Sequence, residues 1–291
     1  MSPSRVAVIT DSASALTVEV CAALGVSLVP LRVVVDGEDR ADTALDNEWF
    51  YDRLAAGARV TTSQPAPADL LAAYQRAAAG GAEAAWSVHL GSGLSGTLNA
   101  AAVAAGMAPI PVRLVDTGTA SMPQGLCVLA AVGEVLRNPG TDVAAVVAAE
   151  AAAQENIFVS LTPGHLERSG RAGTRFDVDL PVLSLRSGRS VEVVGAATDM
   201  NDALARMVAQ LERIEGNVTV AVGGGGAGPW ADALLAAVRQ TPAGSSAVSY
   251  RVPPSMGAHA GPTLGLVISR AAFPAMVLDA MSAGPPGKTA A

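Results

Sequence analysis

Short β-rich runs alternate with Ala- and Leu-rich helical windows along the first half of this 291-residue chain. The pattern predicts strands at 6–10, 28–35, 84–90 and 112–116, and helices at 17–24, 47–56, 67–79, 95–105, 122–136 and 142–153. Strands that alternate with helices in this way are typical of a parallel sheet with helices packed on its faces. We therefore expect an α/β fold that begins with such a sheet.

The pattern changes from Asn156 onward. Two β-rich runs, 183–185 and 191–194, flank a polar turn at Ser187-Gly188, which predicts an antiparallel hairpin. Further strands are predicted at 157–161, 218–222, 247–252 and 264–269, and helices at 200–214 and 230–239. We expect an N-terminal α/β domain at 1–154, a C-terminal α+β domain with a mixed or antiparallel sheet at 155–282, and a disordered tail at 283–291.

The composition argues against several classes of function. The chain carries 19 basic and 26 acidic residues, a formal net charge of −7, and its aromatic content is 3%. Nucleic acids are bound through clustered Lys and Arg and through stacked aromatic rings, so we expect no nucleic-acid partner. The only lysine is Lys288, in the predicted tail, so the folded part should lack a lysine for a Schiff base or for a phosphate-binding loop.

Neither the histidines nor the cysteines indicate a metal or redox site. His89, His165 and His259 are dispersed and have no Cys or carboxylate at ligand spacing, so we expect no metal. Cys21 and Cys127 lie in apolar, helix-like surroundings, which is typical of small buried side chains. The sequence shows no leader of signal-peptide type and no apolar run long enough to span a bilayer. We expect a cytoplasmic protein without stable membrane insertion.

Small polar residues gather in four segments that follow predicted strands. These segments are Thr10-Asp11-Ser12, Thr61-Thr62-Ser63-Gln64-Pro65, Ser92-Gly93-Leu94-Ser95-Gly96-Thr97 and Asp116-Thr117-Gly118. In a parallel α/β sheet such loops meet at the carboxyl edge of the strands, where ligands bind. The sequence therefore predicts a binding site at this edge.

The loop at 92–97 admits an enzymatic interpretation. A nucleophile elbow needs Gly-x-Ser-x-Gly, and here Thr97 replaces the second glycine, so the motif fails by one residue. A serine esterase or thioesterase that uses Ser95 and His259, with Asp11 or Asp116 as the acid, stays open as an alternative.

A phosphate site has less support. The run Gly223–Gly228 matches G-x-G-x-x-G, but no acidic residue follows between Asp232 and Asp279 to bind a ribose. We interpret the run as a glycine-rich turn between a strand and a helix.

The third interpretation of the 92–97 loop is capture of an anion without chemistry. The start of the 95–105 helix and the hydroxyls of Ser92, Ser95 and Thr62 can donate hydrogen bonds to a carboxylate. The competing interpretation is that these hydroxyls only cap their helices. His259 lies in a flexible loop rich in Gly and Ala, which favours a side chain that faces a ligand.

The same segments carry a resemblance to a known family. They are ITDS at 9–12, TSQP at 62–65, SGLSGT at 92–97, Asp116-Thr117 with the helix at 122–129, LERSGR at 166–171 and GAHAGP at 257–262. In this order, across residues 6–270, the chain resembles the DegV family of bacterial fatty-acid-binding proteins.

The resemblance implies a two-domain DegV-like fold, the EDD fold, that encloses one long-chain fatty acid between its domains and needs no cofactor. It places the carboxylate at Thr62 and at Ser95 or Ser92, with Ser63 and His259 nearby. The loop residues Asp11, Ser12, Gly93, Gly96, Thr97 and Asp116 would support these contacts. Family members present the fatty acid to a separate ATP-dependent kinase, which makes an acyl-phosphate for phospholipid synthesis.

Two departures from the family pattern affect the expected partner. Members commonly carry a lysine where this chain has Leu180, and a basic residue on the next strand, near Ala196. Both positions belong to the region thought to serve the encounter with the kinase. A divergent carrier of another amphiphilic acid is therefore a further alternative.

Overall fold

The computed structural model describes residues 6–170, 175–185, 191–271 and 273–282. The predicted disordered tail at 283–291, with Lys288, lies outside these ranges, as does Arg171 at the end of the LERSGR segment.

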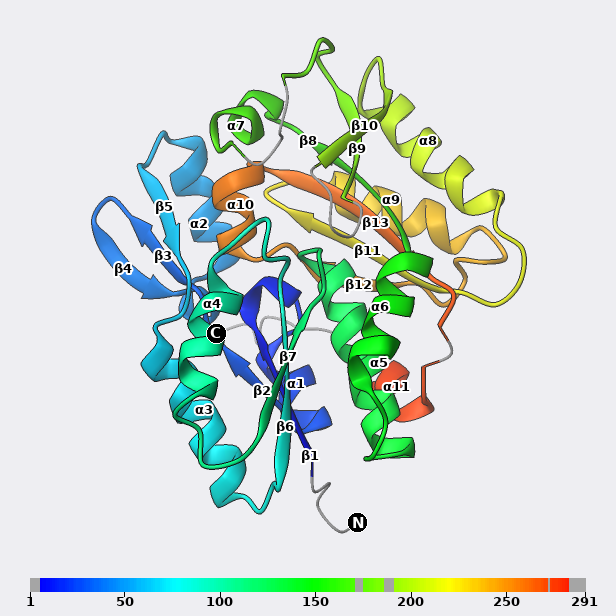
Figure 1. Ribbon diagram of the computed structural model, residues 1–291. Helices are drawn as coiled ribbons and strands as arrows, with labels where there is room; N and C mark the ends of the chain where they lie inside the picture. Colours follow the sequence, from blue (N-terminus) through cyan, green and yellow to red (C-terminus); the bar gives the residue numbers. More distant parts are fainter. Residues whose placement is uncertain (1–5, 171–174, 186–190, 272, 283–291) are drawn as a thin grey trace, which may run out of the picture.

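The N-terminal half contains the predicted parallel sheet, in the lower part of Figure 1. Its strands are β1 (Val6–Asp11), β2 (Val26–Val29), β6 (Ala84–His89) and β7 (Val112–Asp116), in the order β2-β1-β6-β7, and every pair is parallel. The covering helices are α1 (Val18–Leu24), α3 (Pro67–Ala79), α4 (Thr97–Ala105) and α5 (Met122–Arg137). Since both faces are covered, the strands are rich in Val, Ile and Ala rather than alternating.

The second half forms a mixed six-stranded sheet. Its strands are β8 (Glu155–Ser160), β9 (Pro181–Leu185), β10 (Val191–Ala196), β11 (Thr219–Gly225), β12 (Val248–Arg251) and β13 (Thr263–Ser269), in the order β10-β9-β8-β13-β11-β12. Only β11 and β12 pair in parallel, and the predicted antiparallel hairpin is β9–β10. Helices α8 (Met200–Glu212) and α9 (Trp230–Arg239) cover one face, and the other face turns toward the parallel sheet.

A third, three-stranded sheet corrects the sequence prediction. The predicted strand 28–35 is two strands, because Pro30 has no N–H to continue a ladder; β2 ends at Val29 and β3 (Arg32–Val35) begins the new sheet. Its other strands are β4 (Glu38–Ala41) and β5 (Val60–Ser63), in the order β4-β3-β5, followed along the chain from β4 by η2 (Asp42–Ala44) and α2 (Asn47–Ala55). Thr62 and Ser63 therefore lie in a strand, not in a loop after one.

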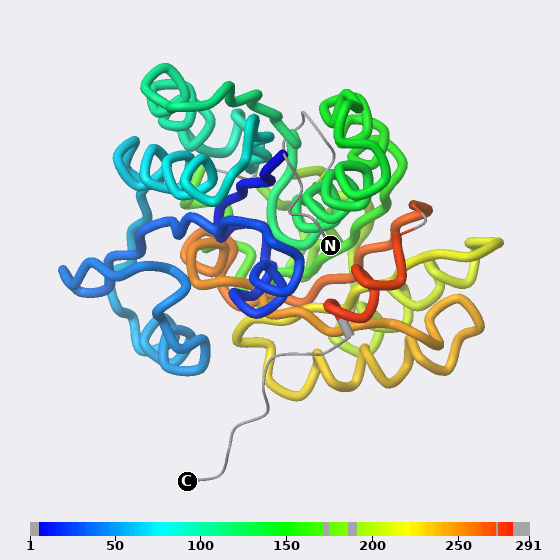
Figure 2. The backbone as a smooth tube through the Cα atoms, turned by 90° about the horizontal axis from the view of Figure 1, so that it is seen from below, coloured from blue at the N-terminus to red at the C-terminus, as the bar shows by residue number. Residues whose placement is uncertain are grey.

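The two large sheets share one hydrophobic core. Side chains of α5 and of α6 (Val143–Ala153) pack in the same cluster as Ala221, Val248 and Val267 of the six-stranded sheet. Helix α11 (Ala275–Ser282), whose residues were expected to belong to the second domain, contacts α1 of the first and lies beside α5 in Figure 1. In the tube view of Figure 2, the red end of the described chain likewise lies against the N-terminal half. The domain boundary near 154 stays a prediction.

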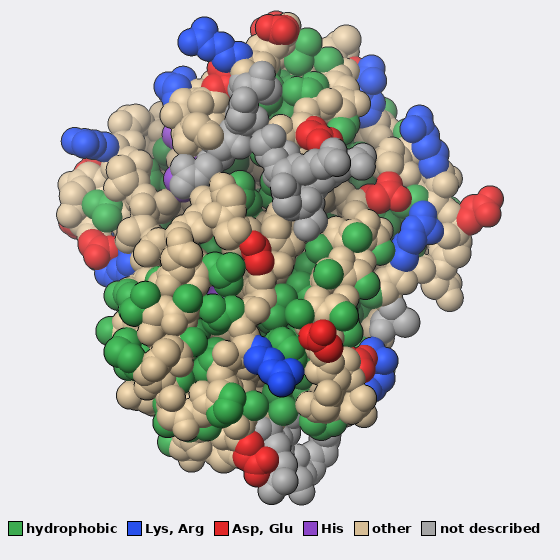
Figure 3. Space-filling model, in the orientation of Figure 1, with side chains coloured by type: hydrophobic (Ala, Val, Ile, Leu, Met, Phe, Trp, Pro, Cys, Tyr) green, Lys and Arg blue, Asp and Glu red, His purple; other side chains and the backbone are tan. Residues whose placement is uncertain are grey.

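Across the described ranges, no helix combines the length and apolar character needed to cross a bilayer. Among these same residues, no group of three or more His, Cys, Asp or Glu side chains could hold a metal ion. On the face drawn in Figure 3, the Lys and Arg side chains are scattered among acidic ones rather than gathered into a patch.

Candidate functional site

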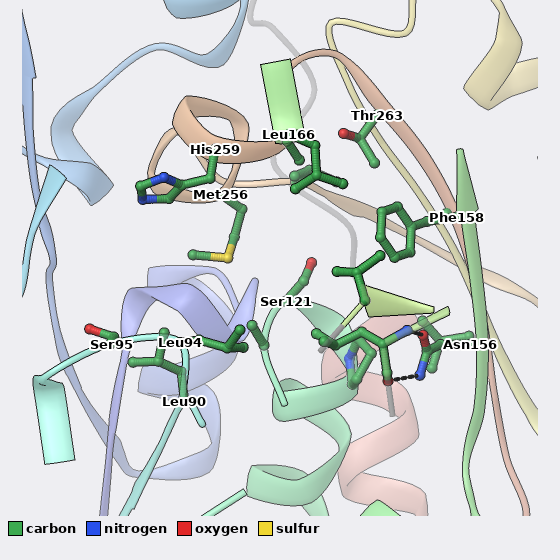
Figure 4. Close-up of a pocket in the computed structure, with 18 of the residues that line it drawn as sticks. Leu90, Leu94, Ser95, Ser121, Asn156, Phe158, Leu166, Met256, His259 and Thr263 are labelled. Atoms are coloured by element: carbon green, nitrogen blue, oxygen red, sulfur yellow. Dashed lines mark hydrogen bonds between the residues drawn. The ribbon is translucent and has the colours of Figure 1, made fainter. Parts of the chain in front are cut away.

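A cavity of about 550 Å³ lies between the carboxyl edge of the parallel sheet and the inner face of the six-stranded sheet. Most of its lining is apolar, and the part shown in Figure 4 includes Leu90, Leu94, Phe158, Leu166 and Met256. The lining residues come from the three-stranded and six-stranded sheets and from segments that follow strands of the parallel sheet. The cavity thus lies at the carboxyl edge of the parallel sheet, where the sequence predicted a binding site.

One end of this cavity carries hydroxyls and an imidazole. Thr62 Oγ1 lies 2.7 Å from Nε2 of His259, and Ser95, Ser63 and Gly96 line the cavity beside them. We call Thr62, Ser95 and His259 the polar end of the cavity. In β5 the side chains alternate between faces, so Thr61 points away from the face on which Thr62 meets the histidine.

His259 is held more firmly than the sequence predicted. It lies in the last turn of helix α10 (Pro254–Ala260), not in a flexible loop. Pro254 begins this helix, where a missing N–H costs nothing, and Gly261, with φ of +69°, ends it. The imidazole therefore projects from a regular element that packs against α2 and β5.

Ser95 lies just before helix α4, which begins at Thr97 rather than at the predicted residue 95. Thr97 N–H donates to Ser95 Oγ over 3.3 Å, and the two side-chain oxygens are 3.0 Å apart. At the neighbouring Gly96 a Cβ would collide with the carboxamide of Gln64. Gly96 thus leaves room for the Gln64 side chain, which also lines the cavity.

Ser92 serves a different contact. Its Oγ donates to Asp116 Oδ2 over 2.5 Å, and its N–H donates to Asp116 Oδ1 over 3.1 Å. Gly118 N–H donates to the same carboxylate over 2.9 Å. Ser92, Gly93, Thr97 and Asp116 do not line the cavity; Ser92 and Asp116 instead fasten two neighbouring loops of the sheet edge together.

Asp11 belongs to a fully buried hydrogen-bond network. Asp11 Oδ2 lies 2.8 Å from His89 Nδ1, and His89 Nε2 lies 2.7 Å from Ser87 Oγ. The order Ser-His-Asp resembles a catalytic triad, but all three side chains are 0% exposed, so no substrate can reach the serine. Gln124 Nε2 and the N–H groups of Ala13 and Leu90 complete the bonds to this carboxylate.

Asp42 is a buried acid that the sequence analysis missed. Its Oδ2 accepts from Ser12 Oγ over 2.7 Å and from Ser255 Oγ over 2.6 Å, and Oδ1 accepts from Ser255 N–H over 3.0 Å. Burial raises its pKa above the ordinary value of 3.8, although the hydrogen bonds act in the opposite direction. Ser12, one of the expected supporting residues, thus acts through Asp42, which ties the parallel sheet to the helix that carries His259.

The esterase arrangement is not assembled in this geometry. The imidazole Nε2 of His259 contacts Thr62, and the hydroxyl of Ser95 contacts Thr97. The two acids considered for a triad, Asp11 and Asp116, bind other groups. The contacts of Ser95, Asp11 and Asp116 are therefore not those of a Ser-His-Asp triad.

Comparison with known proteins places the chain in a family. The family model described as "Uncharacterised protein, DegV family" matches residues 5–271. The chain belongs to the DegV family. A DegV domain-containing protein of Streptomyces coelicolor is 37% identical over 284 residues, covering 91% of this chain and 98% of the relative. Mycobacterium tuberculosis has one that is 32% identical over 223 residues, covering 73% of this chain and 77% of the relative.

Solved DegV structures share the fold. A DegV family protein from Thermus thermophilus, described as fatty-acid-binding, has a TM-score of 0.77 and 28% identity, covering 91% of this chain and 99% of its own. The Bacillus subtilis DegV structure has a TM-score of 0.81 at 23% identity, covering 92% of this chain and 99% of its own. The predicted α/β class, with a parallel sheet and a mixed sheet, is confirmed.

In this DegV protein, the segments that carry the family resemblance divide into two groups. The segments at 62–65, 92–97 and 257–262 contribute residues to the cavity, as do Pro123 of the helix at 122–129 and Leu166 of the LERSGR segment. The segments at 9–12 and 116–117 hold the surrounding loops through Asp11, Ser12 and Asp116.

The glycine-rich run at 223–228 makes room for two tyrosine rings. A Cβ at Gly223 would overlap the ring of Tyr250, and a Cβ at Gly225 or Gly226 would overlap that of Tyr51. Tyr250 lines the cavity, and Tyr51 fills the space between α2 and the six-stranded sheet. The glycines are explained by this aromatic packing.

Proposed function

We propose that this DegV protein is a carrier that binds one long-chain fatty acid, with the carboxylate at the polar end and the acyl chain in the cavity. The observation that carries the proposal is the pairing of a mostly apolar cavity with Thr62, Ser95 and His259 at one end of it. The fatty-acid binding described for the Thermus thermophilus relative supports the same ligand class.

The energetics suit such a ligand. Burying a methylene is worth about 0.8 kcal/mol, so a sixteen-carbon chain gains on the order of 10 kcal/mol when it leaves water. The apolar lining can supply this binding free energy through the acyl chain alone, without contacts to the carboxylate. The polar end then has only to orient the carboxylate.

The carboxylate would be held by hydroxyl and imidazole groups. None of the described residues that line the cavity is Lys or Arg. Hydroxyl and imidazole groups can donate to a carboxylate more weakly than an arginine fork does. A head group held in this way stays available for transfer.

We also propose that the bound acid is presented to a separate ATP-dependent kinase that forms the acyl-phosphate. The polar end is suited to this because Ser63 and Gln64, which line it, are exposed. The two departures from the family pattern adjoin one another, since Ala196 pairs with Pro181 and Ala197 N–H donates to Leu180 O over 2.9 Å. A kinase would meet no basic side chain at these two positions of the β9–β10 hairpin, and Asp179 lies directly before Leu180.

The decisive experiment is mass spectrometry of the organic extract of the protein as purified, followed by rebinding of a fatty acid to the delipidated protein. We expect a long-chain acid in the extract and one binding site per chain. An extract without any acid, together with no uptake of palmitate or oleate, would show that the cavity serves another purpose.

A further inference from the structure

Ser121 places a hydroxyl in the middle of the cavity, away from the polar end. It lines the cavity just before helix α5, and Figure 4 shows its oxygen pointing into the space between Met256 and Phe158. The neighbouring side chains in this part of the cavity include Leu90, Leu94 and Met256, all apolar. A polar atom in such surroundings needs a hydrogen-bond partner.

The part of the chain that the structure describes does not provide that partner. The Oγ of Ser121 is buried and has no hydrogen-bond partner among the described residues. Thr263 and Asn156 also line the cavity, but their side chains are satisfied: Thr263 Oγ1 donates to Gly261 O over 2.9 Å, and Asn156 exchanges two hydrogen bonds with the backbone of Leu185. Ser121 therefore differs from Thr263 and Asn156, whose polar atoms are already paired.

The backbone at Ser121 has a conformation that disfavours serine. Its φ of +60° and ψ of −151° lie in a region that only glycine adopts without strain. Hydrogen bonds hold it there, because its N–H donates to Ala13 O over 2.7 Å and its C=O accepts from Gly125 N–H over 3.0 Å. A serine in this conformation carries strain and in return directs its hydroxyl into the cavity.

Tyr250 adds a second polar group at the same depth. Its ring enters the cavity wall through the gaps left by Gly223 and Gly265, and its phenol interacts with Ser121 without reaching hydrogen-bond geometry. Burial raises the pKa of this phenol, so it stays protonated and can donate at neutral pH. Ser121 and Tyr250 together form what we call the mid-cavity pair.

We infer that the mid-cavity pair binds an oxygen atom in the middle of the acyl chain, so that the preferred ligand is a long-chain acid hydroxylated near its centre. The inference rests on the proposed function, since the carboxylate at the polar end sets which carbon reaches Ser121. The ligand's hydroxyl would accept from Tyr250 and exchange a hydrogen bond with Ser121. An unsubstituted chain would leave the serine unpaired.

The test compares stearate with a set of monohydroxystearates that carry the hydroxyl at successive central carbons. The delipidated protein is titrated by competition against a fluorescent fatty acid. We expect one isomer to bind at least as tightly as stearate. The other isomers should bind at least about tenfold more weakly than stearate, because their hydroxyl is buried without a hydrogen-bond partner.

Variants assign the preference to Ser121. In Ser121→Gly, which suits the backbone conformation, and in Ser121→Ala, the favoured isomer should lose about tenfold in affinity while stearate binds as before or more tightly. Thr263→Val is the matched control, since it removes a cavity hydroxyl that already has a partner. It should leave the ratio between the favoured isomer and stearate unchanged.

The outcomes separate the two proposals. If the wild-type protein binds stearate but binds every hydroxystearate more weakly, or if Ser121→Gly leaves the ratio unchanged, the mid-cavity inference is wrong and the carrier function stands. If the wild-type protein binds none of these acids, the proposed function itself fails.

Discussion

Thr62 and His259 meet across 197 positions of the sequence, with Oγ1 of the threonine 2.7 Å from Nε2 of the histidine. The threonine comes from the three-stranded sheet and the histidine from the helix that leads into β13. The contact joins two structural units at the end of the cavity where a carboxylate would lie. Substitution of Thr62 therefore tests most directly whether the polar end binds the carboxylate.

Thr62→Ala should weaken binding of palmitate by the delipidated protein about tenfold to a hundredfold. A hydrogen bond to a charged group is worth about 1.5–3 kcal/mol, and 1.4 kcal/mol corresponds to a factor of ten. Thr62→Ser should retain most of the affinity, and Thr61→Ala, on the opposite face of β5, should retain all of it. Calorimetric titration measures the palmitate affinities of the three variants. Equal affinity of Thr62→Ala and wild type would remove Thr62 from the site.

Ser95→Ala and Ser92→Ala distinguish the two serines that the sequence left open. We expect Ser95→Ala to weaken palmitate binding about tenfold, because Ser95 lines the cavity. Ser92→Ala should leave affinity unchanged and raise hydrogen exchange in the 92–97 and 116–118 loops, which Ser92 and Asp116 join. The reverse pattern of affinities would assign the carboxylate contact to Ser92.

Asp42→Ala should lower the free energy of unfolding by about 3 kcal/mol or more, because it leaves buried donors of Ser12 and Ser255 unpaired. Asp39→Asn, which breaks only the exposed ion pair with Arg32, should cost at most about 1 kcal/mol. Denaturant titration gives both values. A loss at Asp42 no larger than that at Asp39 would contradict its role as a link between units.

Asp42→Asn should also change how stability depends on pH. Because the pKa of Asp42 is raised in the folded state, the folded protein holds this proton more tightly than the unfolded chain. Its stabilising contribution is therefore present below the ordinary pKa of 3.8 and is lost as the pH rises through the higher folded value. Relative to wild type, Asp42→Asn should gain stability across that window. A difference that is constant with pH would show that Asp42 titrates normally.

Gly257→Ala should disturb the polar end indirectly, through helix α10. A Cβ at Gly257 would overlap the ring of Tyr51, which is 5% exposed and packed between α2 and α10. Displacing the ring would move the helix that holds His259, so we expect weaker palmitate binding together with a stability loss of about 1–3 kcal/mol. Gly216→Ala, where a Cβ meets open space but φ is +91°, controls for backbone strain alone. It should cost stability without changing affinity.

Both cysteines should be unreactive in the folded protein. Cys21 and Cys127 are 2% and 0% exposed, and burial raises the pKa of Cys21 to about 12 and raises that of Cys127 as well. A chromogenic disulfide reagent should therefore detect no thiol in native buffer and two thiols per chain in denaturant. Rapid reaction of one thiol in the folded state would point to an opening near α1 or α5.

The parallel sheet and the hairpin could be predicted because their apolar runs are bounded by clear turn residues. The three-stranded sheet could not, since β4 reads Glu-Asp-Arg-Ala and β5 ends in hydroxyl residues that also suit a loop. Helix α10 was missed because its Gly and Ala residues resemble a flexible segment, whereas two prolines and close packing fix it.

The site was only partly accessible from the sequence. Thr62, Ser95 and His259 could be proposed from the sequence because they belong to short motifs that resemble a family, and their role stays a prediction. Asp42 carries no local signal, since its partners Ser12 and Ser255 lie 30 and 213 positions away. Ser121 was missed because its significance depends on a backbone angle and on an unpaired oxygen, and neither can be read from residue type.

Helix α11 returns to α1 after the chain has completed the six-stranded sheet. The polypeptide thus passes between the two halves once before β8 and once after β13. Two such connections allow fewer rotations of one half relative to the other than a single connection would. Any widening of the space between them to admit a guest must follow a path that both connections permit.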